Sequence, residues 1–400
     1  MRIVAPFGFY GAGNIGDEAT LQGFARLVSR SSARMRVAVA SRNPRHTSRV
    51  EPSFRYFRTD RRGWKRYWAE KLASGLVVAG GTPIMDGLGK WPLCEVTPLV
   101  EEGHRQGKAV AFIGVGTEHL EREESRRIVR ERLGPRVGHW TVRSPQDHAR
   151  LVDYGIPREQ VTVTADMAWL LDPASPDWGR QRLHDWGVPD DRTLIGVNLL
   201  GEKAVLQREP HLFEKVAQFL DHVVEAYGAF VLFLANEVRD EETFDTAAAR
   251  TTRRFMTQKR HTFVAPNEYL APQQMQSLIA NCHATASMRY HFCLFSALEG
   301  VPFVALQRSG KVVDLCSDLQ WPYGVELNGI TVADLVTQFE MLEAQRAGAI
   351  RHLGQRTASL TQEAGRNQLA LDGLCDRQSV TAASASGNGL GPSRRVSAGR

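Results

Sequence analysis

The feature that most constrains this chain is an alternation of short apolar, β-branched runs with amphipathic stretches of helix length. Because a strand, a helix and a second strand form a βαβ unit, this order predicts a parallel sheet covered by helices, and hence an α/β fold. In the first part of the chain we expect strands at Met1–Pro6, Met35–Ala40, Leu76–Ala79, Ala109–Ile113, His139–Val142 and Val161–Thr164.

The alternation is interrupted once, at the turn-forming stretch Asp172–Asp177, and then resumes. A chain of 400 residues exceeds the usual size of a single core. We therefore expect two Rossmann-like lobes with parallel sheets, at residues 1–174 and 191–350, joined by a linker at 175–190 and separated by a cleft. A helical segment follows at 351–378, and residues 379–400 are too poor in apolar side chains to fold. The strands expected in the second lobe are Thr193–Asn198, Phe230–Leu234, His261–Val264, Ala284–Ser287 and Phe303–Leu306.

Composition excludes several classes of function. The formal net charge is +6, and half of it comes from the segment after Cys375, so the folded part lacks the clustered basic face of a nucleic-acid-binding protein. No apolar run has the length of a membrane helix, and the N-terminus lacks the pattern of a secretory signal, so we expect a cytoplasmic protein. Five cysteines without a C-x-x-C pair are typical of reduced core thiols and not of a metal centre.

The segment "GFYGAGNIGDEA" contains Gly11-x-Gly13-x-x-Gly16, the spacing of a dinucleotide-binding loop. That interpretation also requires an acidic residue at the end of the second strand, where this chain has Ser41 and Arg42. Asp17 would also place a negative charge against a pyrophosphate. We therefore expect a different binding role for the loop, or a tight turn in which Asp17 caps the following helix.

The segment "SMRYHFCLFSALEG" predicts a strand that ends at Ser287, followed by a buried helix. Arg289 and His291 thus lie at a helix N-terminus beyond the carboxyl end of a strand, where an anion is favoured. A helix-capping arginine and a core histidine are the alternative interpretation. The residues expected at equivalent strand ends, and hence around one cleft, are Gly80, Gly81, Arg143, Asp166 and Lys311.

Several of these segments resemble the polysaccharide pyruvyl transferase family. The resemblance covers roughly residues 1 to 320, and its two end segments are the most specific. The segments that carry it are "GFYGAGNIGDEA", "LVVAGGTPIMD", "VRSPQDHARLVDYGI", "VTADMAWLL" and "SMRYHFCLFSALEGVPFVAL", followed by Lys311. The chain departs from the family at Ser144, where an acidic residue is common.

The resemblance implies a two-lobed fold similar to that of GT-B glycosyltransferases, with the active site in the cleft between the lobes. It implies that phosphoenolpyruvate donates its pyruvyl group to two hydroxyls of a sugar, free or lipid-linked, as a cyclic ketal. Arg289 and His291 would contact the donor in the second lobe, with His291 as the general acid and with no cofactor or metal. The remaining expected contacts are Lys311, Arg143, Gly13, Asn14, Gly80, Gly81 and Asp166.

Two points remain open from the sequence. The base that deprotonates the acceptor hydroxyl is Asp17 or Asp166, and we favour Asp17 because we expect it to lie in the flexible glycine loop. Arg308 is either an extra phosphate contact or a solvated loop charge.

Two other functions are compatible with the same segments. One is a nucleotide-sugar glycosyltransferase in which Arg289 and Lys311 hold a diphosphate. The other is a non-catalytic scaffold of an envelope-polysaccharide pathway. In that case the arginines and aromatics of Phe54–Leu72 would contact the inner face of the membrane or other polysaccharide-assembly enzymes, although such a stretch is more often a helix with a solvated charged face.

Overall fold

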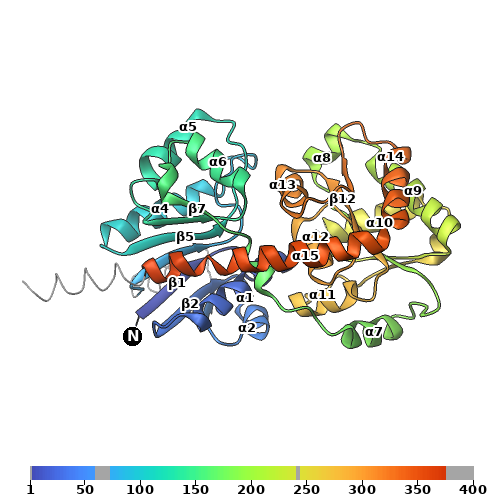
Figure 1. Cartoon of the computed structure of the whole chain (residues 1–400), viewed down its shortest axis with the longest axis horizontal. Helices are drawn as coiled ribbons and strands as arrows, with labels where there is room; N and C mark the ends of the chain where they lie inside the picture. The colour runs from blue at the N-terminus through green and yellow to red at the C-terminus, as the bar shows by residue number, and fades with distance from the viewer. Residues whose placement is uncertain (1, 59–72, 240–243, 375–400) are drawn as a thin grey trace, which may run out of the picture.

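The computed structural model describes residues 2–58, 73–239 and 244–374, and these form two α/β lobes side by side (Figure 1). The first lobe contains a parallel sheet of seven strands in the order β3-β2-β1-β4-β5-β6-β7. Its strands are β1 (Arg2–Phe7), β2 (Met35–Ser41), β3 (Arg55–Arg58), β4 (Gly75–Ala79), β5 (Ala109–Val115), β6 (His139–Val142) and β7 (Val161–Val163).

The second lobe repeats this architecture with a parallel sheet of six strands in the order β10-β9-β8-β11-β12-β13. The α/β fold with two Rossmann-like lobes is thereby confirmed. Its strands are β8 (Leu194–Asn198), β9 (Phe230–Phe233), β10 (Thr262–Val264), β11 (Ala284–Ser287), β12 (Phe303–Gln307) and β13 (Gly324–Glu326).

Helices follow most strands and cover both sheets. In the first lobe these are α1 (Ile15–Arg30), α2 (Pro44–Val50), α4 (Leu93–Arg105), α5 (Glu123–Arg127), α6 (Pro145–Asp153) and the short turns η1 (Ile128–Leu133), η2 (Arg158–Gln160) and η3 (Met167–Leu170). In the second they are α7 (Pro176–Asp185), α8 (Lys203–Arg208), α9 (Leu212–Tyr227), α10 (Asp245–Phe255), η4 (Lys259–His261), α11 (Pro272–Ile279), α12 (Tyr290–Leu298), α13 (Gly310–Leu319) and α14 (Val332–Ala344).

Side-chain caps fix where the helices of the site begin. The Asn14 side chain accepts a hydrogen bond from the Gly16 N–H at the start of α1. At the start of α6 the Ser144 hydroxyl accepts from the Asp147 N–H, and Pro145 occupies the first turn. Each cap satisfies a helix N–H that has no partner within its own helix. Ser144, the position that departs from the family pattern, thus has a structural role in this chain.

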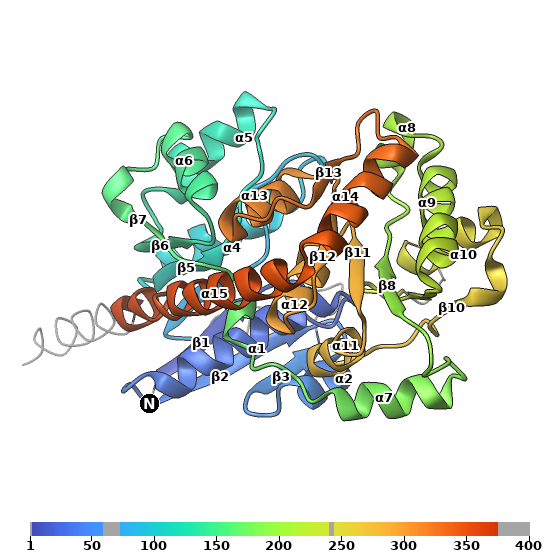
Figure 2. The ribbon, with the colours of Figure 1, turned by 45° about the vertical axis from the view of Figure 1, so that its right-hand side comes forward.

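Helix α15 (Arg346–Gly365) runs along both lobes (Figures 1 and 2). Just after it, buried Asn367 donates to the carbonyl of Ala165 at 2.9 Å and accepts from the hydroxyls of Thr141 and Thr164 in the first lobe. Val4 in β1 and Leu374, the last described residue, belong to the same apolar cluster, which is the larger cluster of the protein. The C-terminal segment therefore stabilises the first lobe although it follows the second in sequence.

The segment interpreted as a linker, residues 175–190, contains helix α7. It belongs to the second lobe, because the Gly179 N–H donates to the Ser277 hydroxyl on α11 at 2.7 Å. Sequence reasoning also placed no strand at β3 or β13, which are short edge strands. The segment predicted to be disordered, 379–400, and most of Phe54–Leu72 lie outside the described residues. Within the described part, no helix combines the length and apolar character needed to cross a membrane.

Candidate active site

A cavity of about 970 Å³ lies between the carboxyl ends of the two sheets. In a doubly wound sheet, ligands bind where the strand order reverses. The first sheet reverses between β1 and β4, and the second between β8 and β11. Residues that follow all four of these strands line the cavity, including Phe9, Gly80, Leu200 and Arg289. Both reversal points thus open into one space.

The lining of this cavity is rich in basic side chains. Eight arginines or lysines face five aspartates or glutamates, so the cavity favours anionic ligands. The basic residues are Arg42, Arg143, Arg150, Arg208, Arg239, Arg289, Arg308 and Lys311, and the acidic residues are Asp17, Glu118, Glu121, Glu202 and Glu237.

His291, in the first turn of α12, lies where the lobes meet. Its Nε2 is 3.5 Å from Oδ2 of Asp166 across the cleft, and neither atom has a hydrogen-bond partner among the described residues. A side chain at Gly16 would place its Cβ 2.0 Å from the Nδ1 of His291, so only glycine allows this approach. The imidazole is therefore held between α1 and Asp166, with 11% of its side chain exposed.

Asp166 carries a negative charge within the protein interior. It caps η3 by accepting from the Ala168 N–H at 2.9 Å, and its Oδ2 is 3.6 Å from the Nη1 of Arg143. Burial alone would raise the pKa of Asp166, but His291 and Arg143 outweigh burial and lower it. Asp166 is thus an ionised partner beside the imidazole of His291.

Arg143, directly after β6, is largely buried and forms part of the cavity wall. Its guanidinium is 4.5 Å from the centre of the Tyr290 ring and 3.8 Å from Asp147, and its Nη2 donates to the Thr82 hydroxyl at 3.4 Å. Burial tends to lower the pKa of Arg143, but Tyr290, Asp147 and Asp166 together raise it. Asp166 and Asp147 offset most of its charge before any ligand binds.

Arg289 is held by two carboxylates that sequence reasoning missed. Its Nη2 donates to Asp245 Oδ1 at 2.6 Å and lies 2.9 Å from Glu237 Oε2. Burial favours a lower pKa for Arg289, but Asp245 and Glu237 raise it. Both partners lie more than forty residues away in sequence. The Arg289 guanidinium is therefore positioned and partly neutralised.

The start of α13 holds cations with less compensation. Arg308 forms an ion pair with Glu202, but its Nε has no hydrogen-bond partner among the described residues, and the buried Ser309 hydroxyl likewise has none. Lys311 lies in the first turn of α13 and is partly buried, and no residue that the structure describes forms an ion pair with it. Burial and the nearby Arg308 lower the pKa of Lys311 to about 8.

Asp17 lies in the first turn of α1, so the expectation that it occupies a flexible loop is wrong. It lines the cavity on the same side as His291. Burial raises the pKa of Asp17 to about 6, against the opposing effect of His291. A carboxyl with this pKa can accept a proton near neutral pH.

The glycine loop ahead of Asp17 joins the two lobes. Gly13 has φ +94°, and its carbonyl accepts from the Val238 N–H at 2.8 Å. A Cβ at this position would be 1.9 Å from the Val238 carbonyl oxygen. The Asn14 side chain accepts from the Asn236 amide at 3.2 Å. Asn14 lines the cavity, whereas Gly13 mainly holds the loop against the second lobe.

Gly80 and Gly81, which follow β4, form part of the cavity wall as expected. Both have positive φ, at +65° and +68°. A side chain at Gly80 would place its Cβ 2.1 Å from Cγ2 of Thr20 on α1, whereas the space beside Gly81 is open. Gly80 therefore allows α1 to approach the end of β4.

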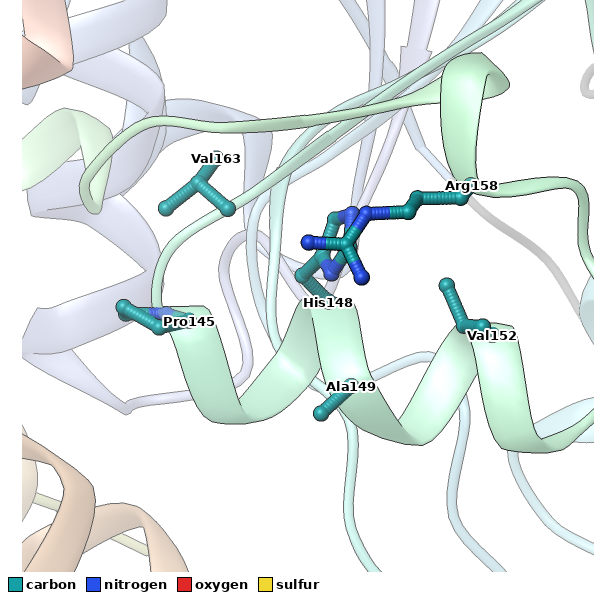
Figure 3. A pocket seen from close by; sticks show the side chains of 6 residues that line it. All are labelled: Pro145, His148, Ala149, Val152, Arg158 and Val163. Atoms are coloured by element: carbon teal, nitrogen blue, oxygen red, sulfur yellow. The ribbon is translucent and has the colours of Figure 1, made fainter.

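A second hollow, of about 490 Å³, lies on the first lobe outside the cleft. Figure 3 shows Arg158 extending over His148, with apolar side chains of α6 and β7 around them. The lining of this second hollow contains no carboxylate and none of the ion pairs found in the cleft. We therefore assign the chemistry to the larger cavity. Among residues 2–58, 73–239 and 244–374, no three His, Cys, Asp or Glu side chains form a group suited to a metal ion.

Comparison with known proteins now bears on this site. The family model for polysaccharide pyruvyl transferase matches residues 14–310, about three quarters of the chain. The chain belongs to the polysaccharide pyruvyl transferase family. A comparison with curated proteins finds no significant match.

Solved structures similar to this pyruvyl transferase family member establish its GT-B-like fold. A putative UDP-N-acetylglucosamine 2-epimerase from Listeria monocytogenes aligns with a TM-score of 0.64 at 12% identity, over 92% of this chain and 95% of that one. MnaA from S. aureus bound to UDP gives 0.63 at 9% identity, over 92% and 94%. HepE from Anabaena bound to UDP-glucose gives 0.60 at 10% identity, over 96% and 100%.

In this pyruvyl transferase family member, most of the residues predicted from sequence lie in one cavity. Asp17, Arg143, Arg289, His291 and Lys311 all line it. Asp166 lies behind His291, as a partner of the imidazole and not as part of the lining. Sequence reasoning missed Asp245 and Glu237. A buried arginine needs carboxylate partners, but the sequence does not indicate which of its aspartates and glutamates they are.

Proposed function

We propose that this protein transfers the pyruvyl group of phosphoenolpyruvate to two hydroxyls of a saccharide as a cyclic ketal and releases phosphate. The observation that carries the proposal is the combination of incompletely compensated cations at the start of α13 with an imidazole flanked by carboxylates. Phosphoenolpyruvate presents two anionic groups and one carbon that must be protonated. The family assignment supports transferase activity on a saccharide, and the donor and the ketal belong to the proposal.

We assign each anionic group of the donor to a cation according to how much of the charge of that cation is already neutralised by carboxylates. Lys311 and Arg308, at the N-terminus of α13, have the most charge left for a phosphate, and the helix start adds free N–H groups. Arg289 has two carboxylate partners, and it suits the single negative charge of the donor carboxylate. This arrangement leaves the alkene carbon on the side of His291.

The reaction then needs one acid and one base. His291, beside the carboxylate of Asp166, donates a proton to C3 of the donor, and positive charge develops at C2. An acceptor hydroxyl attacks C2 while Asp17 takes its proton. Phosphate leaves with the electron pair of its C–O bond, and the second hydroxyl attacks the resulting cation and closes the ring. Its proton returns to His291, and the proton held by Asp17 leaves with the phosphate, so the enzyme is regenerated with neither an oxidant nor a reductant.

The proposal extends to partners and location. The donor is a cytoplasmic metabolite, so we place the reaction in the cytoplasm, with phosphoenolpyruvate as the only co-substrate and no cofactor. A lipid-linked saccharide acceptor would bring the enzyme to the inner face of the membrane. Asp17 lies in the first lobe and the donor cations in the second, so the acceptor binds mainly to the first lobe.

A ligand-induced shift in melting temperature tests the donor, because a ligand that binds only the folded state raises the Tm. We expect phosphoenolpyruvate to raise the Tm of the wild type and to have no effect on Lys311→Ala. UDP-glucose and UDP-N-acetylglucosamine serve as comparison ligands. A shift with a UDP-sugar and none with phosphoenolpyruvate would instead support a nucleotide-sugar glycosyltransferase.

A further inference from the structure

The cavity is much larger than the proposed donor requires. A volume of about 970 Å³ is at the upper end of the range for pockets that hold drug-sized ligands. The cations at α13 and the imidazole occupy the second-lobe side and the junction between the lobes. The rest of the cavity extends over the ends of β1, β2 and β4 in the first lobe, where its lining changes in character.

Two of the aromatic side chains in this part of the lining, Phe9 and Trp91, pack against each other. Phe9 follows β1, and Trp91 directly precedes α4. Their ring centroids are 4.5 Å apart, and the ring planes are nearly perpendicular, at 87°. The Arg42 guanidinium, at the end of β2, lies 4.7 Å from the centre of the Phe9 ring. Two perpendicular rings thus form an aromatic corner, and a cation rests against one of them.

Trp91 in particular has unused binding capacity. The side chain is partly exposed, although it belongs to the cavity wall, and its indole Nε1 has no hydrogen-bond partner among the described residues. The nearby Leu88, which pairs with Trp91 through a short antiparallel bridge, is 56% exposed. A tryptophan that served only to fill the core would be covered, as Trp140 is at 1% exposure.

We propose that Phe9 and Trp91 form the subsite for a pyranose ring of the acceptor. The apolar C–H face of the ring lies against the aromatic corner, and the Trp91 N–H donates to a ring hydroxyl. Aromatic walls with a few placed polar groups are the usual composition of a small-molecule site. The corner shares the cavity with Asp17 and His291, so a ring bound there has hydroxyls on the side of the reacting groups. Its role in pyruvyl transfer rests on the proposed function, whereas binding of the sugar does not.

Saturation-transfer NMR with methyl glycosides tests the subsite without requiring turnover. The probes are the methyl glycosides of β-galactose, β-glucose and α-mannose at millimolar concentration. The variants are Trp91→Ala and Trp91→Leu, which keeps apolar volume but lacks the aromatic face. Trp178→Ala is the matched control, because Trp178 is 36% exposed on α7 and is not part of the cavity lining.

We expect at least one glycoside to receive saturation on its ring C–H hydrogens in the wild type and in Trp178→Ala. Both Trp91 variants are expected to weaken that signal about fivefold, as loss of one aromatic contact implies. Absence of transfer to all three glycosides in the wild type, or equal signals in all variants, would overturn the subsite. The effect of phosphoenolpyruvate on Tm in the same proteins reports separately on the donor, so failure of one proposal is distinguishable from failure of the other.

Discussion

Replacing Asp17 with asparagine separates the proposed catalytic role from the energetic cost of a buried charge. Asparagine keeps the size of the side chain but cannot take a proton from an acceptor hydroxyl. We therefore expect Asp17→Asn to lose most phosphate release, by a factor of about 10² to 10⁴, the usual contribution of a general base.

The same substitution is expected to stabilise the protein. Burial raises the pKa of Asp17 from 3.8 to about 6, so the folded state binds this proton more tightly than the unfolded chain does. The contribution of Asp17 to stability therefore decreases as the pH rises from about 4 to about 6 and stays low above that. The whole difference corresponds to about 3 kcal/mol. Asparagine removes this cost, so the gain is greatest above pH 6 and small near pH 4.

Thermal unfolding at pH 4.5 and pH 8, together with phosphate release at pH 8, measures both effects. We expect Asp17→Asn to raise the Tm by a few degrees at pH 8 and by much less at the lower pH. Asp153→Asn, at an exposed carboxylate on α6, is the control and should change neither quantity. An inactive variant that is less stable than the wild type at pH 8 would refute the energetic argument. An active variant would refute the assignment of Asp17 as base.

Three further predictions follow from the geometry. The kcat/KM for phosphoenolpyruvate should follow a bell-shaped pH profile, because it rises as Asp17 loses its proton near pH 6 and falls as Lys311 loses its charge near pH 8. A flat profile between pH 5 and 9 would contradict both assignments. Gly13→Ala should lower the Tm more than Gly81→Ala, because both have positive φ but only Gly13 contacts the Val238 carbonyl; equal effects would refute an interlobe role for the loop. Arg150→Ala breaks an ion pair with Asp314 in the other lobe and should cost about 1 kcal/mol in urea unfolding; an unchanged stability would show that this pair does not hold the lobes together.

The alternation in the sequence was sufficient to predict the two sheets, because buried parallel strands are nearly continuous apolar runs. β6 and β11 begin and end at the predicted residues. β3 was not predicted, because "RYFR" alternates charge with aromatic residues and lies at the sheet edge, where one side is open to solvent. β13 was not predicted either, because it has only three residues and also lies at a sheet edge.

The sequence predicted those site residues that directly follow the carboxyl ends of strands, because the strand ends determine where these residues lie. That rule brought Arg143, His291 and Lys311 to one cavity, since each follows the carboxyl end of a parallel strand and the two sheets direct these ends toward the same space. It gave no information on pairing between lobes, which depends on how the sheets face each other. The contact of His291 with Asp166 is of this kind. Nor did it show that the glycine loop joins Val238 across the cleft.

Detection of the product tests the central claim most directly. The purified protein is incubated with phosphoenolpyruvate and a panel of saccharides, and the acceptors are analysed by mass spectrometry while free phosphate is measured in parallel. We expect at least one saccharide to gain a single pyruvyl ketal with one phosphate released per product. We expect His291→Ala and Arg289→Ala to abolish both in proteins that remain folded at the assay temperature. Phosphate release without a pyruvylated acceptor, or a product that forms equally well in His291→Ala, would contradict the account.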